Sequence, residues 1–418
     1  MKNLLIIYPH WPPTNLAGVH RPRLIANFLS EFDWHPIILT VDPKYHEEEP
    51  DWDLCQTVRP QVEVIKTRAF SPPARLRIIG DIGIRAFPFL WKKANELIKT
   101  REISAIWIPV PNYYCMVLGR ILYNKHKIPY GIDYIDPWSD GIPGSEQFLS
   151  RAWLSNNLAN RLEPWALKKA AFITGVDQSY YQYIFDRGWV KESTPNAGMP
   201  YGFDPKDHKI STEADVPWER ESFTKTLIYA GAYLPKSKYF LEVFLQVLRN
   251  LNEDEDILQV VFLGTGHYKG ESIKDLAIRN DCGKAVTEIR SRFPYLEILY
   301  FLQEADACFL LGSTEPHYTA SKTFQMLLSK NPIFGILHRA SSATSFLKEL
   351  DADTYLVEWS ESVTDEEFRN AISDQLNGLI KDESWSPDLS ALDKYSARES
   401  AGVLTKVLNT IADSEHEK

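Results

Sequence analysis

Four loops of this chain combine glycines or basic residues with a preceding apolar run, a pattern suited to binding phosphate. One is SKTFQMLLSKNP, in which Ser321, Lys322 and Gln325 share one arc of an expected helix. Ser321 suits the N-cap, and a helix start offers N–H groups to an anion. Lys322 opposes the helix dipole by about 0.3–1 kcal/mol unless an anion lies beside it. The stretch indicates an anion site, although a capped helix without a ligand would explain Ser321 equally well.

Two further loops show the same pattern. LIYAGAYLPKSKYFLEVF carries Gly231, Lys236 and Lys238 between an expected strand and an expected helix. Ammonium groups there can bind phosphate, while solvated lysines are the simpler alternative. LQVVFLGTGHYKG carries Gly264 and Gly266 but lacks the third glycine of the dinucleotide fingerprint. A tight turn without a ligand is the alternative for this loop.

The fourth loop is YPHWPPTNLAGVHRPRL near the start of the chain. Gly18 would let backbone approach a ligand, and Arg21 and Arg23 crowd a helix start. A bound anion would offset the unfavourable interaction of these cations with the helix dipole. Pairing with a carboxylate such as Glu31 or Asp33 is the alternative, and both interpretations stay open.

Composition favours two domains and disfavours nucleic-acid binding. The chain has 418 residues, of which 44% are hydrophobic, so it is too long for one ordinary core and can fill two. Its net charge is -10, with 23 Lys and Arg against 36 Asp and Glu after residue 200. A nucleic-acid binder would carry a broad basic stripe. We therefore expect no nucleic-acid partner.

The cysteines and the apolar runs indicate whether the protein holds a metal and in which compartment it is expected. Cys55, Cys115, Cys282 and Cys308 form neither a zinc pattern nor a disulfide framework, so we expect no metal and a reducing cytoplasm. MKNLLIIYPHWPP is expected to be a buried strand rather than a signal peptide. AIWIPVPNYYCMVLG is broken by prolines and too short to span a bilayer. We expect a cytoplasmic protein, with peripheral contact at the inner face of the plasma membrane as an open alternative.

The elements that must position the four loops alternate between strands and helices. Expected strands are NLLIIY, HPIILTV, VEVIKT, AIWIPV, YGIDYI and FITGV, then LIYAG, LQVVFLG, ACFLLG, PIFGIL and TYLVEW. This alternation predicts parallel sheets with helices on both faces. The polar segment 190–225 marks a boundary, so we expect domains at 1–200 and 201–393. Ligands bind beyond the carboxyl ends of such strands, which is where the loops lie.

These stretches resemble the GT-B glycosyltransferases of family 4. The likeness is carried by YPHWPPTNLAGVHRPRLIANFLSEFDWHPIILT, MPYGFDP, LIYAGAYLPKSKYFLEVF, VVFLGTG and PYLEILYFLQEADACFLLGSTEPHYTASKTFQMLLSKNPIFGI. It implies an α/β protein with two Rossmann-like doubly wound parallel-sheet domains facing a cleft. The first domain would bind the acceptor and the second the nucleotide sugar, and a helix at about 394–412 would cross back to the first.

The resemblance also implies an activity. It is metal-independent transfer, with retention, of a hexose from a UDP- or GDP-sugar to a glycan or lipid-linked acceptor in polysaccharide biosynthesis, without a cofactor. Residues assigned to the donor are Gly18, Arg21, Gly231, Gly264, Gly266, Arg290, Ser321 and Gln325. Negative charge on the leaving diphosphate would be stabilised by Lys236, Lys238 and Lys322. Asp136 and Trp138 in DYIDPWSD match an acidic-aromatic motif on the acceptor side.

The sequence departs from the family pattern at several positions. Gln325 stands where relatives have a carboxylate for the ribose, His317 where they have a glutamate, and Ala232 near an arginine. Lys330 replaces a common glycine. An amide still accepts a hydrogen bond but loses the charge-assisted strength, which is roughly twofold. One alternative is therefore a weakened or inactive GT-B protein that binds nucleotide sugar or a partner enzyme; another is an epimerase or phosphorylase with the same fold.

A basic and aromatic stretch suggests a second surface. ARLRIIGDIGIRAFPFLWKKANELIK carries Arg75, Arg77, Arg85, Lys92 and Lys93 among apolar residues. It could rest on an anionic bilayer beside a lipid-linked acceptor. Helices packed on their own domain are the alternative.

Overall fold

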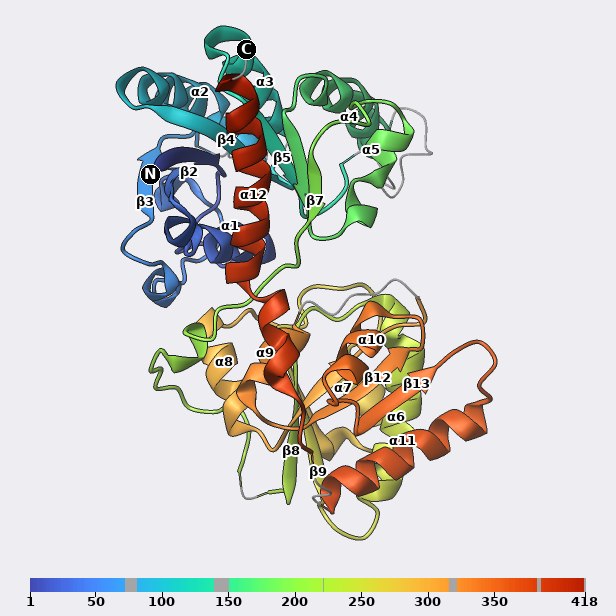
Figure 1. Cartoon of the computed structure of the whole chain (residues 1–418). Coiled ribbons are helices and arrows are strands. Elements are labelled where there is room, and N and C mark those ends of the chain that lie inside the picture. The colour runs from blue at the N-terminus through green and yellow to red at the C-terminus, as the bar shows by residue number, and fades with distance from the viewer. Residues whose placement is uncertain (72–80, 139–149, 221, 316–321, 382–384, 417–418) are drawn as a thin grey trace. The chain divides into compact units, whose positions relative to one another are not determined.

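The chain forms two compact units. The computed structural model describes residues 1–71, 81–138, 150–220, 222–315, 322–381 and 385–416 (Figure 1). The N-terminal unit comprises Met1–Asp204 with Tyr395–Lys418, and the C-terminal unit comprises Pro205–Lys394. Residues Ser321 and His317, singled out in the sequence, lie outside the described ranges, as do Arg75 and Arg77.

The N-terminal unit is built on seven parallel strands in the order β3-β2-β1-β4-β5-β6-β7. The strands are β1 Lys2–Ile7, β2 Trp34–Val41, β3 Glu63–Thr67, β4 Ile103–Val110, β5 Tyr130–Tyr134, β6 Phe172–Gly175 and β7 Asn196–Gly198. The α-helices are α1 Ala17–Ala26, α2 Ile82–Thr100, α3 Tyr114–His126, α4 Arg151–Leu167, α5 Gln182–Asp186 and α12 Ala397–His416.

The C-terminal unit repeats the plan with six parallel strands in the order β10-β9-β8-β11-β12-β13. The strands are β8 Lys225–Ala230, β9 Leu258–Leu263, β10 Val286–Ile289, β11 Ala307–Leu311, β12 Ile333–His338 and β13 Tyr355–Trp359. The α-helices are α6 Lys238–Leu251, α7 Ile273–Arg279, α8 Tyr295–Glu304, α9 Thr323–Ser329, α10 Ser342–Glu349 and α11 Asp365–Ile380.

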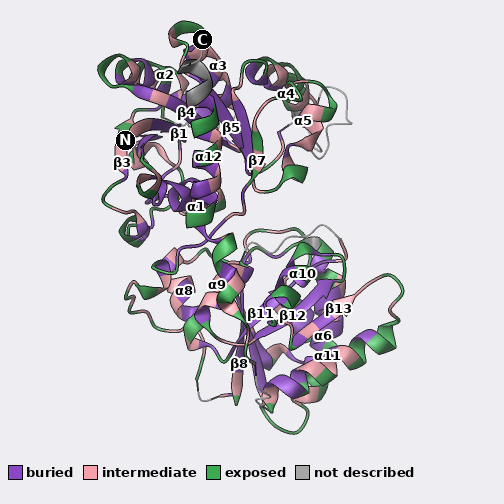
Figure 2. Cartoon of the chain, in the orientation of Figure 1, coloured by how far each residue is buried: buried purple, intermediate pink, exposed green. Residues whose placement is uncertain are grey.

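The predicted α/β class with two doubly wound parallel sheets is confirmed. Central strands are mainly apolar because helices cover both of their faces, with polar exceptions such as Asp133 in β5, and Figure 2 shows them buried. Edge strands β7 and β10 were not predicted from the sequence. The first has the sequence NAG, without an apolar run, and the second, VTEI, is buried only at Val286. Edge strands lack the continuous apolar signal of central ones.

Helix α12 belongs to the N-terminal unit although it lies at the end of the chain. Figure 1 shows it lying along that unit, and Leu404 and Leu408 join a buried cluster with Ile6 and Trp107. Gly202 has a φ of +85°, and a Cβ there would lie 2.9 Å from the Cα of Ala397. The chain can therefore pass close to the start of α12 only because residue 202 is glycine.

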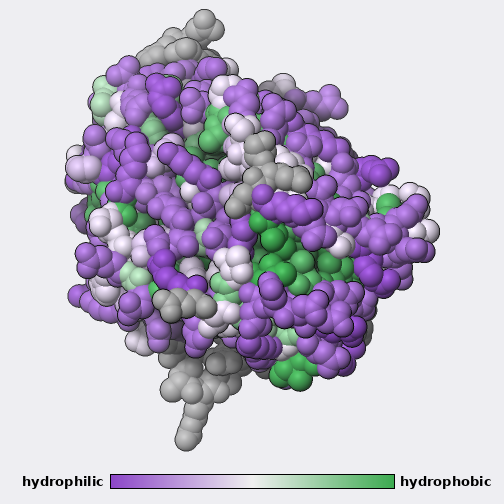
Figure 3. Space-filling model, turned by 90° about the horizontal axis from the view of Figure 1, so that it is seen from below, coloured by the Kyte–Doolittle hydropathy of each residue, from purple (hydrophilic) through white to green (hydrophobic). Residues whose placement is uncertain are grey.

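One face of the molecule shows how polar and apolar side chains are distributed on the surface. The face seen in Figure 3 is largely hydrophilic, with hydrophobic side chains gathered in one area. Within the described ranges, every helix is too short or too polar to cross a membrane.

The strand order fixes where each sheet can hold a ligand. In each sheet the order reverses once, between β1 and β4 in the N-terminal unit and between β8 and β11 in the C-terminal unit. Connections from these two strands leave toward opposite faces, so a crevice opens beyond their carboxyl ends. The residues after these strands are therefore the place to look for a site.

Candidate functional site

A lysine lies at the switch point of the C-terminal unit. Gly231 follows β8, and Lys322 precedes α9 after β11. The ammonium group of Lys322 packs so closely on Gly231 that a Cβ on this glycine would collide with Nζ. A larger residue at position 231 would push the Lys322 side chain aside, and the strand order brings together two residues that are 91 positions apart in the sequence.

Among the described residues, Lys322 is a cation with a cationic neighbour and without a carboxylate partner. Desolvation of its ammonium, followed by the positive charge of Arg292, lowers the pKa of Lys322 to about 8. Lys322 has no ion-pair partner among the described residues. The Lys322 residue is exposed, so an anion can reach it, and a second positive charge beside its ammonium is unfavourable unless an anion joins them. The helix begins at Thr323 with Lys322 at its N-cap, so the cap that we assigned to Ser321 is occupied by Lys322 instead.

The other two predicted lysines already have carboxylate partners. Lys236 is ion-paired with Glu315, on the segment that follows β11. Lys238 Nζ lies 3.8 Å from carboxylate oxygens of both Glu242 and Glu271, which also bind Arg279. Lys238 thus belongs to a surface network of ion pairs. Ala232 is exposed beside these residues, and its carbonyl accepts from the hydroxyl of Tyr229 at 2.7 Å.

The glycine turn after β9 is held by Arg290. Gly264 and Gly266 have φ values of +67° and +78°, which explains both glycines. Arg290 Nε donates to the Gly266 carbonyl at 3.0 Å, and its guanidinium lies 4.2 Å from the ring centroid of Tyr268. Protein groups therefore hold the turn, and Arg290 is braced at the carboxyl edge of the sheet. Its predicted contact with a nucleotide base stays a prediction.

Gln325 has a protein partner. Its Oε1 lies 2.7 Å from Nε2 of His208, and Gln303 Nε2 lies 3.2 Å from the other ring nitrogen. Burial lowers the pKa of His208, which favours the neutral ring. A neutral imidazole donating from Nε2 satisfies the amide oxygen of Gln325. This partner, 117 residues away in the chain, gave no signal in the sequence.

The first-loop arginine Arg21 is a structural residue. Its Nε and Nη2 donate to the two carboxylate oxygens of Asp133 at 2.7 and 2.9 Å, and both side chains are fully buried. Its Nη1 donates to the carbonyls of Met199 and Pro200, each at 2.9 Å. The sequence left open anion binding or pairing with a carboxylate, and the geometry corresponds to the second, with a buried rather than a surface partner. Arg21 has no donor directed to solvent.

Gly18 and Arg23 also contact other residues of the protein. A Cβ at Gly18 would lie 2.5 Å from the hydroxyl oxygen of Tyr8. The close approach that we assigned to a ligand is thus made by a protein side chain. Arg23 is fully buried, and its Nη1 lies 3.5 Å from the carbonyl of Thr57. The cations of this loop stabilise the unit rather than a ligand.

Asp136 presents a carboxylate beyond the end of β5. It has no hydrogen-bond or ion-pair partner in the part of the chain that the structure describes, and burial raises its pKa. Trp138 is buried and stacks on Tyr113, with ring centroids 5.1 Å apart. Phenols near enough for the charge of Asp136 to raise their pKa, after the larger effect of burial, belong to Tyr8, Tyr113, Tyr180 and Tyr201. A carboxylate among phenols can bind the hydroxyls of a sugar.

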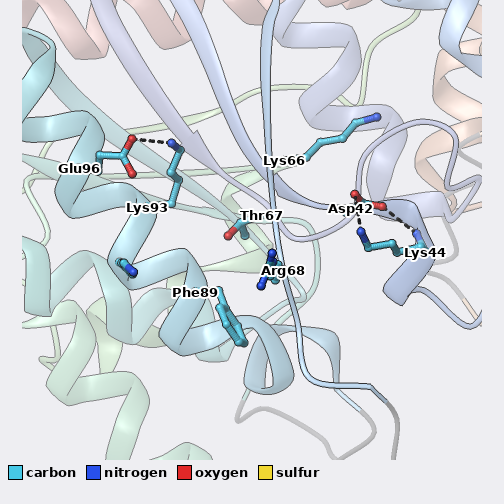
Figure 4. Close-up of a pocket in the computed structure, with 9 residues that line it drawn as sticks. Asp42, Lys44, Lys66, Thr67, Arg68, Phe89, Lys93 and Glu96 are labelled. Atoms are coloured by element: carbon cyan, nitrogen blue, oxygen red, sulfur yellow. Dashed lines mark hydrogen bonds and ion pairs between the residues drawn. The ribbon is translucent and has the colours of Figure 1, made fainter.

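A basic pocket lies beyond the ends of β2 and β3, beside α2. Figure 4 shows its side chains, which are Asp42, Lys44, Lys66, Thr67, Arg68, Phe89, Lys92, Lys93 and Glu96. Five of them are cationic and two are acidic. Arg85 is not part of this surface: it is buried and donates to the carbonyls of Tyr45 and Phe70 at 3.1 and 2.9 Å. Helix α2 is packed on its own unit, and only its outer side is basic.

Comparisons with known proteins show the fold. The sequence matches no family model and no curated protein. Sucrose-phosphate synthase from Thermosynechococcus elongatus is 12% identical with a TM-score of 0.58, over 100% of this chain and 98% of that one. Anabaena HepE, in complex with UDP and glucose, is 14% identical with a TM-score of 0.54 over the full length of both chains. The Candida albicans trehalose-6-phosphate phosphatase N-terminal domain is 14% identical with a TM-score of 0.55, over 100% and 96%. The chain has the two-domain GT-B fold.

Proposed function

We propose that the protein is a retaining, metal-independent glycosyltransferase that moves a hexose from a nucleotide sugar to a glycan or lipid-linked acceptor in polysaccharide biosynthesis. The observation that carries the proposal is the Lys322 ammonium, packed on Gly231 at the switch point beside the charge of Arg292 and without a carboxylate among the described residues. A nucleoside diphosphate is an anion of the size and charge that such a place requires. The HepE structure, which contains UDP and glucose, supports this choice of ligand.

Charge determines the role that we give to each residue. Breaking the bond between the anomeric carbon and the diphosphate leaves negative charge on the phosphate oxygens. A fixed cation in a desolvated place stabilises that charge without reorganisation of water. Lys322 is the residue so placed, with Arg292 beside it. Lys236 can contribute only by exchanging its Glu315 partner for phosphate, and Lys238 contributes little from its surface network.

The acceptor is assigned to the N-terminal unit. Asp136 and the surrounding phenols would accept and donate hydrogen bonds to sugar hydroxyls. The basic pocket in Figure 4 would bind the phosphate of a lipid-linked acceptor, or anionic headgroups of the inner face of the plasma membrane. This arrangement corresponds to a cytoplasmic enzyme with peripheral membrane contact.

A second candidate is a GT-B protein that binds nucleotide sugar or a partner enzyme and has weak activity or none. The hydrogen bond between Gln325 and His208 favours it, because the side chain expected to accept from a ribose hydroxyl already accepts from a histidine. Ribose binding would require this bond to be exchanged or shared.

Calorimetric titration with UDP, GDP, dTDP and ADP, followed by a screen of the matching sugar donors, separates the candidates. The transferase predicts micromolar binding of one nucleotide, about -8 kcal/mol, and transfer of its sugar. Binding without transfer or donor hydrolysis would favour the second candidate. Failure of all four nucleotides to bind at millimolar concentration would contradict both. Release of a free epimerised sugar nucleotide, or a requirement for inorganic phosphate, would identify an epimerase or a phosphorylase.

A further inference from the structure

Three side chains with metal-ligating atoms meet in the N-terminal unit, near the segment that carries Asp42 and Lys44 of the basic pocket. His10 follows β1 and His46 follows β2, and these strands are neighbours in the sheet. The Nδ1 atoms of the two rings are 3.2 Å apart, and Glu48 Oε2 lies 3.9 Å from Nδ1 of His46. One ligand atom from each of the three residues lies within 4.8 Å of the others.

Hydrogen bonds alone do not explain well why the His10 and His46 rings lie so close together. The Nδ1 atom of His46 lies 3.1 Å from the hydroxyl oxygen of Thr14 as well as 3.2 Å from the His10 nitrogen. Each ring nitrogen offers either one proton or one lone pair, so it has one strong hydrogen-bonding direction. Two nitrogens bound to a tetrahedral Zn²⁺ at about 2.0–2.1 Å lie roughly 3.3 Å apart. The separation of the two rings is close to that value.

We propose that His10, His46 and Glu48 bind a divalent transition-metal ion of the Zn²⁺ class, leaving a fourth position for water or a substrate oxygen. Two imidazoles and one carboxylate suit such ions, whereas Mg²⁺ and Ca²⁺ prefer sites made only of oxygen. The site lies at the carboxyl edge of the sheet, where ligands bind in this fold. It goes beyond the proposed sugar transfer, which uses no metal and places the diphosphate in the C-terminal unit.

The surroundings hold the His46 ring in place. Its side chain is only 3% exposed, and the ring forms a hydrogen bond with the Val41 backbone. A backbone hydrogen bond to a ligating imidazole is the usual means of fixing its orientation. Glu48 supplies a negative charge beside His46, and its side chain is 39% exposed and can adjust to an ion.

The test is calorimetric titration of the full-length, untagged, metal-stripped protein with ZnCl₂. We expect one Zn²⁺ per chain, with affinity lowered at least about tenfold in His10→Ala, His46→Ala and Glu48→Gln. His35→Ala is the matched control, because His35 also lies beside a glutamate, with its Nε2 3.3 Å from Glu63, but outside the three-residue group. Co²⁺ should give the visible absorption of a four-coordinate site in the wild type and in His35→Ala, and lose it in the other variants.

Several outcomes would overturn the proposal. They are absence of Zn²⁺ binding at 100-fold molar excess, unchanged binding in Glu48→Gln and His10→Ala, or an equal loss in His35→Ala. Glu48→Gln keeps the test decisive if a histidine variant fails to fold, because Glu48 is exposed. Nucleotide binding measured on the same samples distinguishes this proposal from the proposed function, since the metal variants should bind nucleotide as the wild type does.

Discussion

Arg21 and Lys322 occupy comparable places and have opposite surroundings. Arg21 lies within α1, the helix that follows β1, and Lys322 directly precedes α9, the helix that follows β11. Arg21 makes four hydrogen bonds to Asp133 and to two carbonyls. Lys322 has a neighbouring cation and a glycine backbone, and no carboxylate within the described ranges.

The difference shows how a structural cation is distinguished from a binding one. A buried guanidinium whose charge is fully paired has no free hydrogen-bond donor for a ligand. Breaking the pair should destabilise the unit. A desolvated ammonium without compensation costs stability that an anion can restore. The hydrogen-bonding and ion-pair partners of a cation, more than its position in the sequence, show whether it is structural or binds a ligand.

The largest effect on stability is expected when the buried ion pair of Arg21 and Asp133 is broken. Asp133→Ala leaves Arg21 buried and unpaired, and should lower the free energy of unfolding by about 3–5 kcal/mol in urea denaturation. Glu31→Ala is the control, because it removes a carboxylate that binds Arg59 and Arg398 at the surface, for a loss of about 0–1 kcal/mol. Equal losses in the two variants would show that the Arg21 pair is not what stabilises this unit.

The next effect concerns nucleotide binding by Lys322. Lys322→Ala should weaken binding of the preferred nucleotide at least about tenfold, or about 1.4 kcal/mol, without loss of stability. Lys238→Ala should change it less than threefold, because Lys238 is exposed and held by Glu242 and Glu271. Calorimetry checks both. If neither variant altered binding or transfer rate, the leaving-group role would have to be abandoned.

The lowered pKa of Lys322 predicts that nucleotide affinity depends on pH. The pKa of Lys322 is about 8 in the free protein, so its charge is lost as pH rises above 8. If the charged form binds the diphosphate, the Kd should rise by up to about tenfold per pH unit above 8 and stay flat in Lys322→Ala. The group binds more protons unfolded than folded between about pH 8 and 10.5, so its contribution makes the protein more stable as pH rises through that window. A wild-type Kd independent of pH from 7 to 9.5 would contradict the assignment.

The smallest effect is expected at Lys330, where a substitution tests whether the stability of α9 influences nucleotide binding. Lys330 ends this helix with a φ of +68°, the left-handed conformation that favours glycine. Lys330→Gly should therefore raise the free energy of unfolding by about 0.5–1 kcal/mol and leave nucleotide affinity unchanged. Thermal denaturation and calorimetry on one preparation measure both. A large change in affinity would mean that α9 acts on the ligand through its packing.

The sequence by itself determined the fold class. Apolar runs such as β1 and β9 are continuous because both faces of a parallel strand are covered, and this pattern can be read without coordinates. The glycines at positions 264 and 266 were also found from sequence, since their backbone conformations require them. Edge strand β7 could not be found, because a three-residue strand exposed at one side carries no such pattern.

Only the tertiary structure decided which charges are compensated. The partners that settle the question are far away in the chain: Asp133 is 112 residues from Arg21, and His208 is 117 residues from Gln325. The grouping of His10 with His46, 36 residues apart, depends on two neighbouring strands in the same way. Local sequence fixes strands and turns through short-range preferences, whereas ion pairs and ligand sets are fixed by the order in which strands join the sheet.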